Sequence, residues 1–241
     1  MTEATQRQTG LPAWWEPLLT RVRLSEAADF TRLPTPESGG RESAVLVLLG
    51  ESSPGPADHT GGGDGQAGRC GAGGPDVLVL QRADTLRSHP GQPAFPGGAC
   101  DPGDADVAAT ALREAAEEVG LDPGSVEVVA RLPTLWIPVS DFRVTPVLGW
   151  WRSPHPVRPV DVAEVARVER LPIAELVEPA NRLRVRHPSG WIGPAFRVQG
   201  MLVWGFTAGV LSSLLEMGGW SLPWPTDRVE EMPGTGSRPV G

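Results

Sequence analysis

The positions of apolar residues along the chain predict a set of short β-strands separated by loops. Leucine and valine gather in runs of strand length and composition, and glycine, proline or polar residues bound each run. The predicted strands cover residues 44–49, 76–82, 126–132 and 143–151, with a weaker pattern at 165–172.

The clearest helical periodicity lies in residues 105–119. Asp104 or Asp106 can cap the N-terminus of this helix, and Gly120 stands where a left-handed residue ends a helix. At about 100° per residue, one stripe of the helix is apolar and the opposite side is acidic. The apolar stripe consists of Ala108, Leu112, Ala115 and Val119.

Two further segments have helical character. Residues 13–22 predict a short helix near the N-terminus, and residues 199–217 predict a longer apolar helix near the end of the folded part. Strands, helix, strands and helix thus follow one another without strict alternation. That order predicts an α/β (α+β) fold, a layered sandwich with a mixed β-sheet.

The chain is long enough for one sizeable domain with poorly structured ends. We expect residues 1–40 to form an N-terminal extension, 41–222 the domain and 223–241 an unstructured tail. Residues 50–75 are rich in glycine and contain almost no large apolar side chains, so they cannot bury enough surface to offset the entropy of ordering. They are predicted to be a disordered loop between two strands.

Composition limits the partners of the protein. The net charge of −8 and the pI near 5.1 argue against a nucleic-acid footprint, which needs a basic patch. Residues 201–215, the most apolar stretch, fall short of the about 20 residues that span a bilayer. The N-terminus has no secretory pattern, and Cys70 and Cys100 are too few for a disulfide framework. We therefore expect a cytoplasmic protein with reduced cysteines and no membrane or nucleic-acid partner.

Three glutamates, Glu114, Glu117 and Glu118, lie within about 100° of one another on the acidic side of the predicted helix. Like charges at this spacing repel by roughly 0.2–0.5 kcal/mol per pair, and no lysine or arginine four residues further along relieves them. The acidic side is either a solvated surface or a ligand set for a hard cation such as Mg²⁺ or Mn²⁺. The preceding "FPGG" turn at 95–98, which can bring a backbone carbonyl to the helix, favours the cation.

The segments "FPGG" (95–98) and "REAAEEVGL" (113–121) together resemble the Nudix box. That pattern is Gly, five residues, Glu, seven residues, then Arg-Glu-apolar-any-Glu-Glu-any-Gly-apolar, and its second half matches at every fixed position. The first half departs. Asp104 stands six residues after Gly98 in place of Glu, and one residue too many separates it from Arg113. The resemblance implies an α/β/α sandwich, a site for Mg²⁺ or Mn²⁺, and hydrolysis of a phosphoanhydride.

The segment "LQRADTLRSHPGQPAFPGG" (80–98) resembles the signature that precedes the Nudix box in coenzyme A diphosphatases. This resemblance implies a small-molecule substrate, coenzyme A or a related nucleotide, cleaved to 3′-phosphoadenylate and 4′-phosphopantetheine. Arg82 and Arg87 are the candidate phosphate contacts, because guanidinium groups bind phosphate oxygens bidentately. For His89, which has no second histidine at ligand spacing, a loop hydrogen bond is favoured over a metal.

The same resemblance implies roles for single residues. Arg113 belongs to the catalytic set, and Gly97 and Gly98 border the substrate. The resemblance does not decide which of three carboxylates accepts the proton of the attacking water. One of the three, Glu164, lies outside the Nudix box and corresponds to a family carboxylate by its position in the chain alone. The implied metal ligands are Glu114, Glu117, Glu118 and the Gly97 carbonyl, and the three candidate bases are Glu114, Glu117 and Glu164.

Two other functions remain compatible with these residues. The first is pyrophosphohydrolysis of another substrate, such as ADP-ribose, NADH or a nucleoside triphosphate. The second is a non-catalytic Nudix domain that binds a nucleotide, which would be expected to lose box glutamates but is kept open by the altered first half of the box. The sequence does not decide between a monomer and a homodimer.

Overall fold

A mixed β-sheet forms the centre of the protein. The computed structural model describes residues 10–34, 36, 39–51, 74–86, 90–138 and 140–232. Within them, eight strands form the main sheet, whose central order is β3-β2-β1-β7-β5. β1 (Arg41–Glu51) runs parallel to β7 (Phe142–Trp151) and antiparallel to β2 (Pro75–Arg82). Parallel and antiparallel pairs in one sheet confirm the predicted mixed topology.

Shorter and outer strands complete this sheet. β3 (Pro93–Ala94) and β8 (Val165–Pro172) pair with β2, β4 (Gly97–Ala99) pairs with β1, and β5 (Val126–Arg131) and β6 (Leu135–Ile137) pair with β7. The weak sequence pattern therefore predicted β8 at its observed bounds. The two- and three-residue strands β3, β4 and β6 were missed, because segments this short carry no periodicity of their own.

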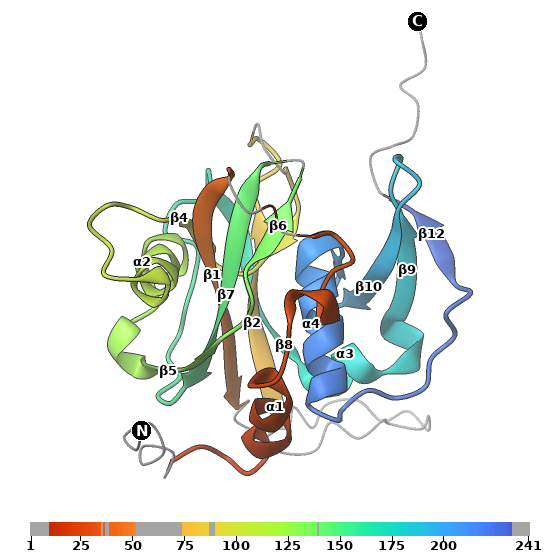
Figure 1. Ribbon diagram of the computed structural model, residues 1–241, viewed down its shortest axis with the longest axis horizontal. Coiled ribbons are helices and arrows are strands. Elements are labelled where there is room, and N and C mark those ends of the chain that lie inside the picture. Colours follow the sequence, from red (N-terminus) through yellow and green to blue (C-terminus); the bar gives the residue numbers. More distant parts are fainter. Residues whose placement is uncertain are drawn as a thin grey trace, which may run out of the picture.

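Helices cover both faces of the sheet. Successive side chains of a strand point to opposite faces, so Leu46 of β1 packs with α2 (Val107–Val119) while Val47 packs with α1 (Trp15–Val22) and α4 (Gly205–Met217). Figure 1 shows α2 on one side of the sheet and α1 and α4 on the other. These layers confirm the predicted α/β sandwich, with α2 on one face and α1 and α4 on the other.

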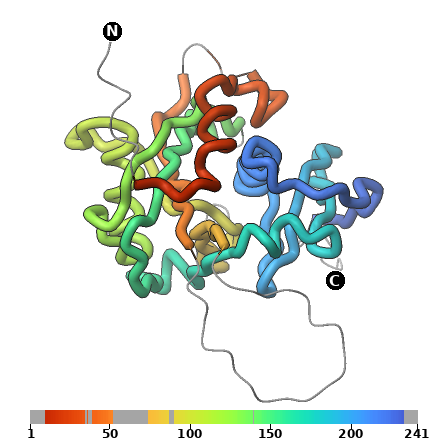
Figure 2. The backbone as a smooth tube through the Cα atoms, turned by 90° about the horizontal axis from the view of Figure 1, so that it is seen from below, coloured from red at the N-terminus to blue at the C-terminus, as the bar shows by residue number. Residues whose placement is uncertain are grey.

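A second, smaller sheet was not predicted. Its order is β11 (Met201–Val203), β10 (Ile192–Val198), β9 (Arg182–Arg186) and β12 (Val229–Glu231). It lies beyond α4, on the far side from α2 (Figure 1). Seen from below, the same C-terminal part, drawn in blue, stands beside the body formed by the earlier segments (Figure 2).

Single helical turns connect these elements. They are α3 (Ile173–Val177) and the 3-10 helices Ala27–Asp29, Pro123–Ser125 and Pro179–Asn181. None of the helices in the described segments combines the length and the hydropathy needed to cross a membrane.

The predicted helix 199–217 begins later than expected, at Gly205. Val198 pairs with Met201 across a two-residue turn in which Gln199 and Gly200 both have positive φ, 51° and 73°. Turns of this kind join antiparallel strands whose twist they match. The apolar residues before Gly205 therefore pair as β11 instead of extending the helix.

The prediction of an unstructured tail at 223–241 is wrong for its described part. Residues 229–231 form β12, which runs parallel to β9. Trp224 lies over the guanidinium of Arg182, 4.6 Å from ring centre to Cζ, and Phe196 covers Arg182 at 5.2 Å. Because Arg182 is only 1% exposed, the tail closes over a buried cation. Residues 233–241 lie outside the described part.

The predicted loop at 50–75 is shorter at both ends than expected. β1 continues through Gly50 and Glu51, which pair with Asp76 and Pro75 of β2. Residues 52–73 of the predicted loop lie outside the described part of the chain. At the N-terminus, the helix expected at 13–22 is present as α1, and its Trp15 and Leu18 belong to the same apolar cluster as α4.

Truncating Trp224 tests how the tail is held. We expect W224A to lower the free energy of unfolding by about 1–2 kcal/mol, because Arg182 loses one covering ring, and to speed tryptic cleavage after Arg228. Urea unfolding and timed proteolysis measure both effects. L222A is the matched control, since Leu222 in the same segment is 48% exposed. Equal cleavage rates in the two variants would contradict a clamp formed by Arg182 and Trp224.

Candidate functional site

Helix α2 carries the acidic residues, and both of its ends are capped. Asp106 accepts hydrogen bonds from the N–H groups of Ala108 and Ala109, each at 2.9 Å. Gly120 ends the helix with φ of 68° and donates to the carbonyl of Ala116 at 3.1 Å. Asp106, one of the two predicted caps, is therefore the N-cap, and Gly120 has the left-handed conformation that the sequence predicted.

The three glutamates of α2 have three different environments. Glu117 is largely exposed, with 60% of its side chain accessible, whereas only 18% of the Glu114 side chain is accessible. Glu118 is half-buried by the same measure. The predicted acidic side of the helix is thus turned partly toward the protein, because the buried stripe is centred on Ala108, Ala111 and Ala115 rather than on Leu112.

Glu118 is the carboxylate with the least compensation. Burial raises its pKa to about 7, and the charges of Glu114 and Glu164 add to this increase. A hydrogen bond from the Gly97 N–H, at 2.9 Å, and the charge of Arg82 oppose it. Within the described residues, no arginine forms an ion pair with Glu118.

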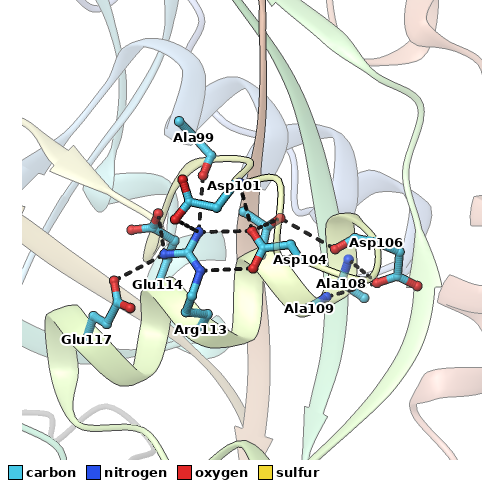
Figure 3. A network of polar contacts seen from close by, with 10 residues as sticks. Ala99, Asp101, Asp104, Asp106, Ala108, Ala109, Arg113, Glu114 and Glu117 are labelled. Atoms are coloured by element: carbon cyan, nitrogen blue, oxygen red, sulfur yellow. Dashed lines mark hydrogen bonds and ion pairs between the residues drawn. The ribbon is translucent and has the colours of Figure 1, made fainter.

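Arg113 neutralises the other two glutamates. Its Nη1 lies 3.0 Å from Oε1 of Glu114 and 3.1 Å from Oε2 of Glu117 (Figure 3). Burial raises the pKa of Glu114, and the hydrogen bond from Arg113 counteracts that increase. No lysine or arginine lies four residues after any of these glutamates, as the sequence shows, but Arg113 lies four residues before Glu117 and forms the ion pair from that side.

Asp104 holds the other edge of the Arg113 guanidinium. Nε and Nη2 of Arg113 each lie 3.0 Å from an oxygen of Asp104 (Figure 3). Thr110 donates its hydroxyl to the same carboxylate at 2.8 Å. These hydrogen bonds, with that from Arg113 first, keep the pKa of Asp104 well below its usual range. Sequence reasoning missed Thr110, because it lies outside the predicted apolar stripe, on the side of the helix that was expected to be acidic.

The glycine turn lies directly against the glutamates. An added Cβ at Gly98 would lie 2.5 Å from the carboxyl carbon of Glu114, and one at Gly97 would lie 2.3 Å from the carbonyl oxygen of Ala44. Both residues belong to β4, which pairs with Ala44 and Val45 of β1. At Gly97 only glycine permits this approach, and at Gly98 a side chain would displace the Glu114 carboxylate, so the "FPGG" turn contacts the acidic helix through a backbone N–H rather than through the expected carbonyl.

The chemistry of the donors suits a hard divalent cation. All of the side-chain candidates are carboxylates, and the half-buried Glu118 forms no ion pair with a basic side chain among the described residues. The predicted set is not preassembled, however. In the described residues, no group of three or more His, Cys, Asp or Glu side chains already converges as a metal site. Arg113 would have to share Glu114 or Glu117 with the ion.

Two residues outside the helix approach this cluster. Arg82 ends β2 at a bulge in its pairing with β8, and its Nε is buried without a hydrogen-bond partner. Ala83 donates its N–H to the carbonyl of Glu164 at 2.9 Å, which brings the exposed Glu164 beside Arg82. Arg87 and His89, also singled out by the sequence, lie outside the described residues.

A cavity of about 530 Å³ lies on another part of the surface, and none of the glutamates of α2 lines it. Its polar groups already have partners. Arg170 forms an ion pair at 2.7 Å with Asp76, and the ring of His155 accepts the N–H of Asp122. The cavity is lined by Leu78, Pro154, His155, Pro156, Val157, Val168, Glu169 and Arg170. We assign it no part in the site.

The raised pKa of Glu118 makes the metal-free protein sensitive to pH. Since the folded-state pKa of about 7 exceeds the ordinary value of 4.5, its contribution to stability is fully present below pH 4.5 and is lost as the pH rises through 7. We expect E118Q to be more stable than the wild type at pH 8 by about 1–3 kcal/mol, with little difference at pH 5. Urea unfolding in chelator measures this. The exposed Glu178→Gln is the control, and parallel pH curves for E118Q and wild type would exclude a buried, uncompensated carboxylate.

The contact between Gly98 and Glu114 predicts a large effect of one methyl group. We expect G98A to destabilise the protein by about 1–3 kcal/mol, because the methyl displaces Glu114 from Arg113. Gly103, in the same loop, has open space where a Cβ would lie, so G103A should stay within about 0.5 kcal/mol of the wild type. Thermal unfolding of both variants measures the difference, and equal stabilities would contradict the close approach.

The chain is similar to known proteins of one family. A family model described as "NUDIX domain" matches residues 68–190, just over half of the 241 residues. An uncharacterized Nudix hydrolase, NudL, from Cronobacter sakazakii is 40% identical over 146 residues, which is 58% of this chain and 73% of the relative. The NudL of Citrobacter koseri is 43% identical over 147 residues, with the same coverage.

Similar solved structures carry the same family name. A Nudix hydrolase from M. smegmatis, RenU, has a TM-score of 0.46 and 16% identity, covering 78% of this chain and 91% of its own. A Nudix hydrolase from Alicyclobacillus acidocaldarius has a TM-score of 0.44 and 21% identity, covering 78% and 100%. On the family model and the NudL relatives, this chain belongs to the Nudix hydrolase family.

Proposed function

We propose that the protein hydrolyses the pyrophosphate bond of coenzyme A or one of its thioesters, releasing 3′-phosphoadenylate (adenosine 3′,5′-bisphosphate) and 4′-phosphopantetheine. Membership of the Nudix hydrolases supports the class of reaction, which is metal-dependent hydrolysis of a phosphoanhydride in a nucleotide. The choice of coenzyme A as the substrate is more specific than family membership supports. It rests on the resemblance of residues 80–98 to the coenzyme A diphosphatase signature.

One observation supports this choice most directly, and it concerns Arg82. The guanidinium of Arg82 is close enough to Glu118 to lower the pKa of that carboxylate, yet its buried Nε has no partner. A cation with an unused donor beside the predicted metal ligands is suited to a phosphate oxygen. Arg82 is also the first arginine of the signature, so sequence pattern and geometry point to the same residue.

The residues of the site divide into three roles. Glu118, with Glu114 and Glu117, would hold Mg²⁺ or Mn²⁺ together with the Gly97 carbonyl. The bound ion supplies charge neutralisation on the pyrophosphate and lowers the pKa of water. Arg113 fixes two of the glutamates, and Arg82 binds and orients the pyrophosphate.

A carboxylate must accept the proton of the attacking water. Arg113 forms ion pairs with Glu114 and Glu117, whereas Glu164 has no ion pair with any described residue and is exposed beside Arg82. Among the three candidates we therefore assign the role of general base to Glu164. Positioning and electrostatic stabilisation supply most of the rate in phosphoryl transfer, so no covalent intermediate is needed.

A substrate panel tests the proposal. The purified protein is incubated with Mg²⁺ or Mn²⁺ and with coenzyme A, dephospho-coenzyme A, ADP-ribose or NADH, and the products are resolved by phosphorus NMR. We expect coenzyme A to have the highest kcat/KM and to yield the 3′,5′-bisphosphate. E118Q should reduce kcat by at least about 100-fold, and the exposed Glu178→Gln should not change it.

The other outcomes separate the competing functions. Faster hydrolysis of ADP-ribose or NADH would replace coenzyme A with another nucleotide substrate. Binding of a nucleotide without turnover of any substrate would indicate a non-catalytic domain. Wild-type kcat in the E118Q variant would exclude Glu118 from the reaction.

A further inference from the structure

The loop before α2 departs from the family pattern in two ways at once. Asp104 has one methylene less than the glutamate of the pattern, and one extra residue separates it from Arg113. Each change alone would move the carboxylate relative to the guanidinium. The observed contacts nevertheless hold both nitrogens of one guanidinium edge at 3.0 Å from Asp104.

A tight turn explains how the shorter side chain reaches Arg113. The N–H of Asp104 donates to the carbonyl of Asp101 at 3.0 Å, and the N–H of Asp101 donates back to Oδ2 of Asp104 at 3.0 Å. Pro102 occupies the second position of this turn, which favours its fixed φ. The turn folds the chain back, so that only 10% of the Asp104 side chain is accessible.

The Asp104 carboxylate is saturated by this arrangement. It accepts from Nε and Nη2 of Arg113, from the Asp101 N–H and from the hydroxyl of Thr110, and a carboxylate has about four acceptor sites. Thr110 is fully buried, and its hydroxyl bonds Asp104 at 2.8 Å, a shorter contact than its 3.4 Å to the carbonyl of Asp106. Four donors from three residues of the loop and helix leave the carboxylate little freedom to move.

The position of Arg113 then sets that of the glutamates. Nη2 donates to the carbonyl of Ala99 at 3.2 Å, and Nη1 is left to reach Glu114 and Glu117. A shift of the guanidinium would carry both carboxylates with it. The contacts thus form a chain that runs from the buried hydroxyl of Thr110 through Asp104 to the exposed side of α2.

We propose that Asp104, Thr110 and the extra residue Ala105 form one positioning unit for Arg113, in which the added residue compensates for the missing methylene. None of the three touches the reacting groups. They act through Arg113 on Glu114 and Glu117. The kinetic part of this inference rests on the proposed function, whereas the contacts themselves do not.

If Ala105 compensates for the shorter side chain of Asp104, then lengthening that side chain and deleting Ala105 should each be harmful alone and should offset one another when combined. D104E adds about 1.5 Å of reach at an unchanged backbone, so the longer side chain cannot keep all four donors. Deletion of the exposed Ala105 shortens the loop around an unchanged Asp104. Both changes together restore the length and the glutamate of the family pattern.

We expect D104E and the Ala105 deletion each to lower kcat by about 10–100-fold with KM within a factor of about three of the wild type, as outer partners of metal ligands do. The combined variant should recover kcat to within about fivefold of the wild type. A combined variant no faster than the slower single variant would overturn the inference, as would full activity in D104E.

A second measurement needs no activity and no loop deletion. T110V and D104A, singly and together, are unfolded in urea with chelator present. Since both remove the same contact, T110V should lower the urea midpoint in the wild type and leave it unchanged in D104A. An equal shift in both backgrounds would overturn the link from Thr110 to Asp104. If the wild type turns over no substrate of the panel, the proposed function fails and this cycle still decides the inference.

Discussion

The site depends on one constraint, which is that three carboxylates must share one side of a 13-residue helix while that helix packs against a sheet. Two of the three carboxylates are neutralised by a side chain of the protein itself. Arg113 forms ion pairs with Glu114 and Glu117 and is itself held by Asp104. Glu118 is left with a backbone N–H and the more distant charge of Arg82, and its raised pKa reports the deficit. The proposed cation would offset that residual deficit, since a partly buried carboxylate without a charged partner is unfavourable.

The sheet makes this crowding possible, because it brings the glycine turn to the helix. β4 pairs with the central strand β1, and α2 packs on the same face of that strand. Gly97 consequently lies too close to β1 for a side chain, and a side chain at Gly98 would displace the Glu114 carboxylate. The N–H that binds Glu118 comes from the same turn. Backbone geometry, rather than side-chain chemistry alone, therefore positions the least compensated carboxylate.

The C-terminal part of the chain contains a buried arginine. Arg182 is almost fully buried, and burial lowers its pKa. The guanidinium lies over the rings of both Phe196 and Trp224, and Ser212 accepts a hydrogen bond from Nη2 at 3.0 Å. This sheet and the tail that closes it lie on the far side of α4 from α2 (Figure 1). Arg182 therefore stabilises the fold of this part, whereas Arg82 and Arg113 lie at the acidic helix.

Local sequence determined the elements whose causes are local. The periodicity and caps of α2, the long strands of the main sheet and the "REAAEEVGL" motif were all readable from residues near in the chain. Tertiary structure decided the rest. The strand β12 forms only because β9 offers an edge more than 40 positions earlier, and its own three residues carry no signal. Likewise, the pairing of Asp104 with Thr110 and Arg113 depends on a turn that folds the loop back onto the helix. Burial and charge compensation are properties of such long-range contacts, so the sequence alone indicated where the carboxylates gather but not which of them would remain without a partner.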